Sequence, residues 1–259
     1  MKKERLLELE KFIDQNGLVT IDELCDQFQV SLSTIRRDLD TLAAEKSIQK
    51  VYGGARSIKN TEEGSSLLKS YDERHSAHAL EKQIIAKQAA SFIEENDIIF
   101  IDTGSSTVPI MDFLRPFHHL TIITNSILVL LRGLEYPNLT VVGLPGLVKS
   151  KTASLVGASC LEAIEAYNSV LKSFMACSAI DLAHGASNSS LEEFEIKKKI
   201  IAYSHKKYLL VDHSKFDHVA LKTFAEIQDF DGIITDVAPR QEYVQHCDAN
   251  QVRLYIANV

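Results

Sequence analysis

The sequence has no apolar run long enough to span a membrane, although 45% of its 259 residues are apolar. Its start, Met1 to Glu4, is polar and leads into an amphipathic helical pattern, which argues against a secretory signal segment. The cysteines are scattered without the spacing of metal ligands or of a disulfide framework, at Cys25, Cys160, Cys177 and Cys247. We therefore expect a cytoplasmic protein with reduced thiols, a sizeable core, no metal and no cofactor.

The chain also has no overall excess of basic charge. The first sixty residues carry ten basic and ten acidic side chains, so the formal net charge of −7 comes entirely from the remainder. Within that neutral segment, residues 46–60 hold four basic side chains and no acidic one. The distribution indicates that only the N-terminal part is suited to contact nucleic acid.

Residues 31–42 have the pattern of a short amphipathic helix. Ser31 is a natural N-cap because its hydroxyl can satisfy a free amide of the first turn. The apolar residues that follow have the three-and-four spacing of one helix face, at Leu32, Ile35, Leu39 and Leu42. The opposite face then consists of Ser33, Thr34, Arg36, Arg37, Asp40 and Thr41.

The surrounding residues complete a helix-turn-helix with a wing. A helix at residues 3–15 precedes Asn16-Gly17, and Thr20 with Glu23 has the capping-box spacing that starts a second helix. That second helix ends at Gln29-Val30, which is the tight turn before the third helix. Residues 48–52 alternate in character before Gly53-Gly54, which indicates a hairpin.

This arrangement predicts which residues contact DNA. In a helix-turn-helix the second helix of the pair lies in the major groove, where guanidinium groups meet guanine edges or phosphates. The alternative is that the paired arginines form the solvated face of an ordinary bundle; the whole pattern favours DNA. The expected contacts are Ser31, Ser33, Thr34, Arg36, Arg37 and Thr41 on the helix, and Lys50, Tyr52 and Arg56 on the hairpin.

The rest of the chain alternates strands and helices. A polar stretch at residues 57–66 is typical of a linker. Beyond it, short apolar strands recur near residues 97–101, 120–124, 139–143, 174–179, 208–212 and 232–236, most of them separated by helical segments. This order predicts a three-layer α/β domain with a largely parallel sheet. We expect domains at residues 1–57 and 76–259, joined by a linker at 58–75.

The first strand of the sheet is followed by a glycine and several hydroxyls. Asp102 to Thr107 leads into a helix that begins at Val108-Pro109. A glycine allows close backbone approach, and amides at a helix start attract anions, so the segment predicts a phosphate cradle. A Ser-rich connection that merely caps the helix is the alternative. The spacing matches neither a nucleotide P-loop nor a dinucleotide fingerprint.

Two further strand ends carry polar residues. Thr124, Asn125 and Ser126 follow the second strand, where the amide is suited either to sugar hydroxyls or to a turn. Lys215 lies after a later strand and is suited either to offset phosphate charge or to remain solvated. Because ligands of parallel sheets gather at the carboxyl ends of strands, convergence of these segments predicts a pocket.

The run Thr34-Ile35-Arg36-Arg37-Asp38-Leu39, followed by Val51-Tyr52-Gly53-Gly54-Ala55, resembles the signature of DeoR-type bacterial transcriptional regulators. The resemblance implies a winged helix-turn-helix joined to a sugar-phosphate-sensing domain, and a repressor of a carbohydrate operon. It continues along the chain through Arg74, residues 81–86, 101–107, 124–126, 212–216 and 233–236.

The resemblance also assigns roles and a fold. The family's effector domain is related to ribose-5-phosphate isomerases and glucosamine-6-phosphate deaminases. By that likeness, Gly104, Ser105, Ser106 and Thr107 would hold the phosphate, Asp102, Asn125 and Asp181 would lie near the sugar, and Lys215 would close the site. The chain departs from the family pattern where two glycines are replaced by Ala176 and Ala179, and where Leu144-Pro145-Gly146 replaces a Gly-Gly. Each added Cβ narrows the space for a ligand.

Two other functions compete with a regulator. An isomerase or deaminase with a DNA-binding head would need acid–base groups, for which the candidates are Asp181, His184, Glu192, Glu193 and Glu195. A purely architectural role on DNA would not account for the long α/β portion of the chain. We expect a regulator that binds double-stranded operator DNA and a phosphorylated sugar. One reading head covers only a half-site, so we expect at least a homodimer.

Overall fold

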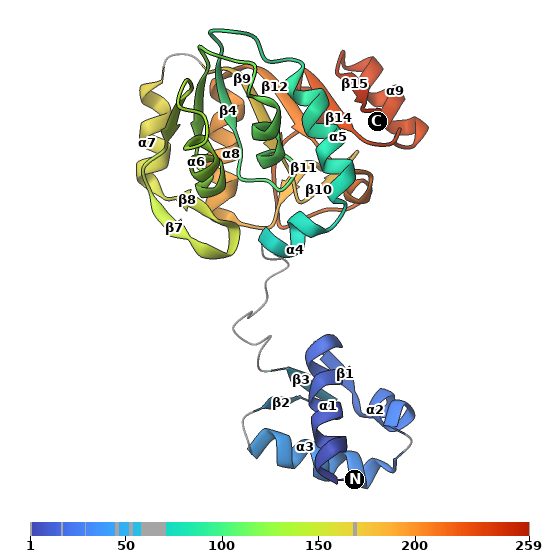
Figure 1. Cartoon of the computed structure of the whole chain (residues 1–259). Coiled ribbons are helices and arrows are strands. Elements are labelled where there is room, and N and C mark those ends of the chain that lie inside the picture. Colours follow the sequence, from blue (N-terminus) through green and yellow to red (C-terminus); the bar gives the residue numbers. More distant parts are fainter. Residues whose placement is uncertain are drawn as a thin grey trace. The chain divides into compact units, whose positions relative to one another are not determined.

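The computed structural model describes residues 2–16, 18–28, 30–44, 47–51, 54–57, 71–167 and 170–258. The chain divides into two compact units, Met1–Ser66 and Leu67–Val259 (Figure 1). Most of the expected linker, residues 58–70, lies outside the described residues, so its bounds stay a prediction. In the described ranges, no helix combines the length and apolar character that crossing a membrane requires.

The N-terminal unit contains three helices and a small antiparallel sheet. Its helices are α1 (Lys2–Asn16), α2 (Ile21–Phe28) and α3 (Leu32–Ala44). Its strands are β1 (Leu18–Thr20), β2 (Ile48–Val51) and β3 (Gly54–Ser57), in the order β1-β3-β2. Leu9, Ile13, Ile35 and Leu39 are fully buried in a core shared by helices and sheet. The expected helix-turn-helix followed by a hairpin is confirmed.

The second unit is built on a seven-stranded sheet. All its strand pairs are parallel, in the order β15-β14-β12-β9-β4-β5-β6. The strands are β4 (Ile98–Ile101), β5 (Thr121–Thr124), β6 (Thr140–Gly143), β9 (Val170–Ala176), β12 (Ser204–Leu210), β14 (Gly232–Thr235) and β15 (Arg253–Ile256). The parallel sheet expected from the alternating pattern is confirmed.

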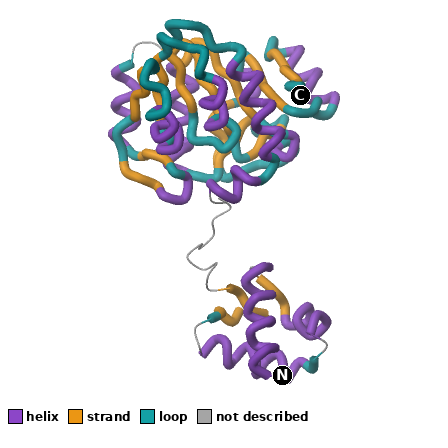
Figure 2. The backbone as a smooth tube through the Cα atoms, in the orientation of Figure 1, coloured by secondary structure: helices purple, strands orange, loops and turns teal. Residues whose placement is uncertain are grey.

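Helices cover both faces of this sheet (Figures 1 and 2). The helices are α4 (Tyr71–Ser76), α5 (Ala79–Ala90), α6 (Ile127–Gly133), α7 (Ala158–Ala166), α8 (Leu191–Tyr203) and α9 (Gln241–Ala249). Along β4, Ile99 and Ile101 pack in one cluster with α5, while Phe100 packs in the opposite cluster with α7 and α8. Successive strand residues point to opposite faces of the sheet, so strands that are apolar throughout make both faces apolar. Helices cover each face, which gives three layers, with the sheet between two layers of helices.

The direction in which successive strands are added to the sheet reverses beside β4. The chain proceeds outward from β4 through β5 to β6, returns to pair β9 against the other side of β4, and then continues outward to β15. Such a reversal leaves a crevice between the two loops that leave the adjacent strands, here after Ile101 and after Ala176. The sheet topology therefore places a ligand site at the ends of β4 and β9.

Several short elements complete the unit. A three-stranded antiparallel sheet, in the order β10-β11-β13, consists of β10 (Ala179–Asp181), β11 (Gly185–Asn188) and β13 (Lys222–Ala225). A hairpin joins β7 (Leu147–Lys149) to β8 (Ser154–Val156). The 3₁₀ segments are η1 (Val108–Phe113), η2 (Ser150–Thr152), η3 (His213–Lys215) and η4 (Ile227–Asp229). The antiparallel sheet is an element that the alternating pattern of the sequence does not predict.

Candidate functional sites

Helix α3 presents the two neighbouring arginines to solvent. Ile35, Leu39 and Leu42 bury one face of the helix in the N-terminal core. Arg36 and Arg37 are exposed, and none of the described residues forms an ion pair with either side chain. The two guanidinium groups are therefore available to an external partner, as a DNA-reading helix requires.

The start of α3 is organised by Ser31. Its carbonyl accepts hydrogen bonds from the amides of Thr34 (2.9 Å) and Ile35 (3.0 Å). Its hydroxyl contacts the hydroxyls of Ser33 (3.0 Å) and Thr34 (2.9 Å), which forms a small exposed cluster at the helix N-terminus. Ser31 thus takes the expected N-cap position, with a carbonyl that opens the helix and a hydroxyl that faces other hydroxyls.

Of the other expected DNA contacts, the structure describes the side chain of Thr41 but not those of the hairpin residues. Thr41 donates its hydroxyl hydrogen to the carbonyl of Arg37 at 3.0 Å, so that hydrogen is used within the helix. Lys50 and Arg56 belong to the paired strands β2 and β3, but their side chains fall outside the description, as does Tyr52 entirely. Their contacts with DNA stay predictions.

The second unit holds a cavity of about 300 Å³ beyond the ends of β4 and β9. The loop after β12 and the residues around the antiparallel sheet complete its wall. It is lined by Arg74, Thr103, Gly104, Ser105, Ser106, Ala176, Cys177, Ser178, Ala179, Asn188, Ser189, Glu193, Lys197, Ser214, Lys215, His218, Val219 and Ala220. The structure thus brings together four of the expected ligand residues, Gly104, Ser105, Ser106 and Lys215.

The turn after β4 lines this cavity. No described group accepts a hydrogen bond from the amides of Gly104, Ser105 or Ser106, nor does either serine hydroxyl have a partner there. Thr107 lies behind the turn and donates its hydroxyl hydrogen to the carbonyls of Asp102 (2.7 Å) and Gly104 (2.9 Å). Successive free amides in a closed turn form an anion-binding concavity.

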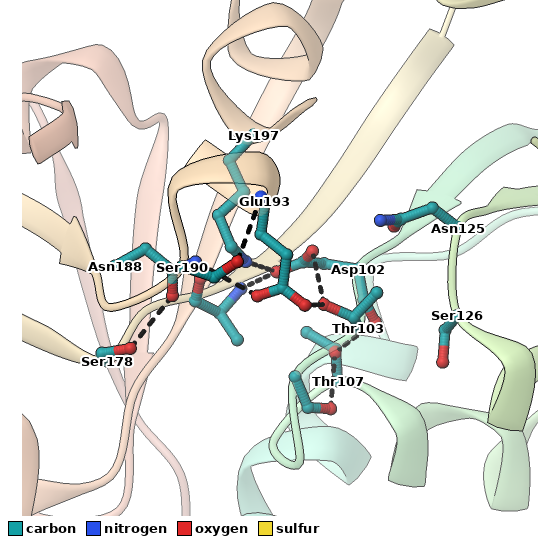
Figure 3. Close-up of polar contacts among 12 residues, drawn as sticks. Asp102, Thr103, Thr107, Asn125, Ser126, Ser178, Asn188, Ser190, Glu193 and Lys197 are labelled. Carbon is teal, nitrogen blue, oxygen red and sulfur yellow. Dashed lines mark hydrogen bonds and ion pairs between the residues drawn. The ribbon is translucent and has the colours of Figure 1, made fainter. Parts of the chain in front are cut away.

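Asp102 lies beneath the turn in a buried ion pair with Lys197 of α8 (Figure 3). Both side chains are almost completely buried, with 1% and 3% exposed. Asp102 also accepts the amide of Ala176 at 3.0 Å, and Lys197 donates to the carbonyl of Ala176 at 2.9 Å. The pair therefore ties together the ends of β4, β9 and α8. Asp102 is not part of the cavity wall, whereas Lys197 is.

A second buried carboxylate, Glu193, reaches the cavity from α8. It accepts hydrogen bonds from the hydroxyl of Thr103 (3.3 Å) and the amide nitrogen of Asn188 (3.1 Å), as Figure 3 shows. The Asn188 carbonyl oxygen in turn accepts the hydroxyl of Ser178 at 3.0 Å. This side of the cavity consists of hydroxyl, amide and carboxylate groups, which is the donor and acceptor set that binds sugar hydroxyls.

Positive charge exceeds negative charge on the cavity wall. The wall contains the cations Arg74, Lys197 and Lys215 and one carboxylate, Glu193. Burial raises the pKa of the wall residue Cys177 to about 12, so this thiol stays neutral near neutral pH. The balance favours an anionic ligand.

Just behind this wall, burial lowers the pKa of Lys82 to about 8; Lys215 and Arg74 also lower it, whereas Asp212 raises it. The lowered pKa therefore reflects chiefly the burial of this ammonium group.

Gly104 is required by its packing against Ala176. A Cβ placed on Gly104 would overlap the Cβ of Ala176, and it would come within 3.2 Å of the Thr107 hydroxyl. Ala176, one of the two departures from the family pattern, therefore fills the space beside the turn. Ala179, the other departure, also lines the cavity.

Three expected ligand residues after β5 lie away from the cavity wall. Thr124 donates to the carbonyl of Ile101 (2.6 Å), Asn125 donates to that of Leu155 (3.2 Å), and Ser126 caps α6 by accepting the amide of Val129 (3.3 Å). Figure 3 shows Asn125 and Ser126 apart from the linked network around Asp102. These contacts hold β5 and α6 in place, whereas the buried Oδ1 of Asn125 has no partner among the described residues. A ligand contact at these residues stays a prediction.

Asp181 also lies outside the cavity wall. Its carboxylate accepts the amides of Ala183 (2.9 Å) and His184 (3.1 Å) and contacts the His184 ring at 2.7 Å. The hydrogen bond from His184 and these backbone amides lower the pKa of Asp181. The residue therefore stabilises the turn between β10 and β11, and its proposed contact with the sugar stays a prediction.

The acidic residues considered for catalysis are dispersed. Glu192 pairs with Lys149 at 2.5 Å and Glu195 with Lys222 at 3.7 Å, both on the protein surface. Only Glu193 of the five candidates lines the cavity. Where side chains are described, no three His, Cys, Asp or Glu residues gather as a metal site would require.

Sequence reasoning missed Lys197 and Asn188. Lys197 stands in the run Lys197-Lys198-Lys199, which has the appearance of a solvated helix face. The only available signal was its helical spacing from Phe194 and Ile201, which are both buried. Asn188 belongs to a strand of four residues, which is too short for a periodic pattern to show.

Comparisons with known proteins agree with both units. Residues 5–61 match the DeoR-like helix-turn-helix domain, and residues 77–237 match the DeoR C terminal sensor domain. A solved ribose 5-phosphate isomerase A from Neisseria gonorrhoeae aligns over 52% of each chain with 18% identity and a TM-score of 0.37, which is too weak a likeness to carry an argument.

Full-length relatives are transcriptional regulators. The chain is 38% identical to the HTH-type transcriptional regulator IolR of Bacillus subtilis over 99% of this chain and 100% of that protein. It is 30% identical to a lactose phosphotransferase system repressor of Staphylococcus aureus over 91% and 92% of the two chains. It is 29% identical to the HTH-type transcriptional regulator GolR of Listeria innocua over 90% of each. The chain therefore belongs to the DeoR family of helix-turn-helix transcriptional regulators.

Proposed function

We propose that this regulator represses a carbohydrate-metabolism operon and that a phosphorylated sugar bound in the cavity changes its affinity for operator DNA. The observation that carries the proposal is the cavity wall, where free backbone amides and an excess of cations face polar groups suited to sugar hydroxyls. The relative named as a repressor of the lactose phosphotransferase system supports a role in carbohydrate control.

In this proposal the phosphate lies against the turn after β4. The amides of Gly104, Ser105 and Ser106 would donate to its oxygens, and Lys215 would offset its charge. Thr107 would hold the turn closed, while Asp102 would fix its base through Lys197. A dianionic phosphate is the ligand group that best satisfies several parallel donors at once.

The sugar would extend toward α8 and the antiparallel sheet. Glu193 and Asn188 already share a hydrogen bond and retain further acceptor and donor capacity. Hydroxyl groups can donate to the carboxylate and accept from the amide, so this side would distinguish a sugar from free phosphate.

On the DNA side, α3 would enter the major groove. Arg36 and Arg37 would contact guanine edges or phosphates, Ser31, Ser33, Thr34 and Thr41 would approach the backbone, and Lys50, Tyr52 and Arg56 would extend the contact along neighbouring phosphates. One head reads one half-site, so at least a homodimer would bind a repeated or palindromic operator.

The test uses the full-length protein and a duplex that it selects from a random-sequence pool. Fluorescence anisotropy would follow operator binding while a panel of sugar phosphates is titrated. We expect at least one of them to change operator affinity severalfold and to be recovered unchanged.

Paired serine variants make this test specific. The double variant S105A/S106A removes two hydroxyls that line the cavity and keeps the backbone amides, so it should weaken the response to ligand severalfold and keep its operator affinity without ligand. Ser159→Ala, an exposed serine of α7, is the matched control. The proposal is wrong if no phosphorylated sugar alters operator binding, or if one is consumed.

A further inference from the structure

Arg74 is a cavity residue whose charge has no ion-pair partner among the described residues. It belongs to α4, the first described element after the DNA-binding unit along the chain. Its Nε and Nη2 atoms are buried and make no hydrogen bond, and none of the described carboxylates lies within ion-pair distance. Buried guanidinium donors without acceptors are costly, so such an arrangement needs an explanation.

Neighbouring side chains hold Arg74 in this position. Its guanidinium lies over the ring of Tyr71, 5.7 Å from the centroid, and Tyr71 packs against the core of the sheet. Lys82 of α5 donates to the carbonyls of Arg74 and of Ala77, the latter at 2.5 Å. The end of α4 is therefore tied to α5, and Arg74 also lines the cavity.

The rest of the wall indicates what acceptor is missing. Lys215 and Gly104 line the same cavity, and the free amides after β4 also lack acceptors. Three sets of donors therefore face one space of about 300 Å³. A phosphate group offers enough oxygens to satisfy them together, and the planar fork of an arginine can bind two of these oxygens in parallel.

We propose that Arg74 is a ligand-binding residue of the sensor, which binds the anionic group in the cavity and thereby fixes α4. This inference rests on the proposed function, because it requires a phosphorylated ligand in that cavity. It adds a route for regulation, since α4 is the described element that leads back along the chain toward the DNA-binding unit. Ligand occupancy would order α4 by satisfying its buried guanidinium.

Arg240 provides a matched control. Its guanidinium also lies over a tyrosine ring, 5.9 Å from the centroid of Tyr243, but it is 58% exposed and already paired with Asp217 at 2.5 Å. A change at Arg240 removes the same chemical group from a surface site outside the cavity. Comparing the two positions separates ligand binding from general effects of losing an arginine.

The experiment measures binding and local order in the full-length protein. Isothermal titration with inorganic phosphate, and with the sugar phosphate from the panel that binds most tightly, would compare wild type, R74M, R74K and R240M. We expect roughly tenfold or greater weakening in R74M, an intermediate loss in R74K and no change in R240M. Hydrogen exchange should show ligand-induced protection of residues 71–82 in wild type and in R240M but not in R74M.

The possible outcomes distinguish failure of the role of Arg74 from failure of the proposed function. Equal binding and equal protection of α4 in wild type and a folded R74M would overturn the role of Arg74 and leave the proposed function standing. No binding of any phosphorylated compound by wild type would overturn both. If R74M proves unstable, unweakened binding by R74K would count against the inference, because lysine keeps the charge and loses the bidentate fork.

Discussion

At the scale of single residues, the buried pair of Asp102 and Lys197 should dominate the stability of the site. Removing one partner leaves an uncompensated charge in the protein interior, which costs about 3–5 kcal/mol. We expect Asp102→Ala to lower the free energy of unfolding of the sensor unit by that amount in urea titrations. Replacing both partners together, as in D102L/K197M, should restore much of the loss.

An exposed pair provides the comparison for that prediction. Lys206 and Asp231 lie 2.7 Å apart at the surface, with 58% and 28% of their side chains exposed. Because solvent screens such pairs, Lys206→Ala should cost about 1 kcal/mol or less. Equal costs at the two pairs would contradict the structural role given to Asp102.

Lys82 should give the stability of the sensor unit a distinctive pH dependence. Its pKa is lowered from 10.5 to about 8 in the folded protein, chiefly by burial. Between about pH 8 and pH 10.5 the unfolded chain therefore binds more protons than the folded one, so unfolding becomes less favourable as pH rises. The wild-type protein should gain stability relative to Lys82→Met across this window.

Lys206 provides the control for the Lys82 prediction. A hydrogen bond from its ammonium group to Asp231 raises the pKa of Lys206 above 10.5. The contribution of Lys206 to stability is present below pH 10.5 and is lost as pH rises through its folded pKa. The wild-type protein should therefore not gain stability relative to Lys206→Met between about pH 8 and pH 10.5. A flat difference between wild type and Lys82→Met would show that Lys82 titrates as it does in water.

At the scale of elements, α3 and the hairpin should contribute differently to DNA binding. If Arg36 contacts a base, Arg36→Ala should reduce the preference for operator over random duplex by roughly tenfold or more. If Lys50 contacts phosphate, Lys50→Ala should weaken binding to all sequences and reduce the slope of log affinity against log salt by about 1. Salt-dependent anisotropy titrations measure both quantities.

Two comparisons make the DNA prediction decisive. Lys206→Ala, in the other unit, should change neither quantity, because its ammonium group is paired with Asp231. Operator titrations that do not change in either Arg36→Ala or Lys50→Ala would remove the proposed DNA surface.

Elements with strong apolar patterns were the ones that sequence could predict. The strand at residues 98–101 follows from an unbroken apolar run, and the helix at 191–203 follows from a segment long enough to show a helical period. The antiparallel sheet was missed because β10 has three residues and β11 is built of Gly185, Ala186, Ser187 and Asn188, which have little strand propensity. Its strands β11 and β13 pack against α8, a tertiary contact that no local pattern contains.

The candidate site was predictable to the same extent. Gly104, Ser105 and Ser106 adjoin a strand end and could be found from their types and spacing. Asn125 was nominated by the same argument, but its strand lies on the far side of β4 from β9. Strand order decides which loops meet, and residue types along one chain do not contain that order.

At the scale of the whole molecule, ligand and DNA should affect each other reciprocally. If the bound sugar phosphate weakens operator affinity by some factor, operator must weaken sugar-phosphate affinity by the same factor. Calorimetric titration of the ligand into free protein and into the protein–operator complex should give the ratio found by DNA titration. Unequal ratios would show that the two titrations do not follow one common binding equilibrium, as when the ligand binds at a second site.

Because the chain returns to pair β9 with β4, the DNA-binding unit is complete during synthesis well before the cavity is. The DNA-binding unit leaves the ribosome first and has a core of its own, so it can fold before the rest of the chain exists. The cavity, in contrast, has no second wall until β9 and α8 have been made, and Lys215 follows later still. A premature stop codon anywhere between residues 67 and 170 would therefore yield a protein that retains the DNA-binding unit and lacks any response to metabolite.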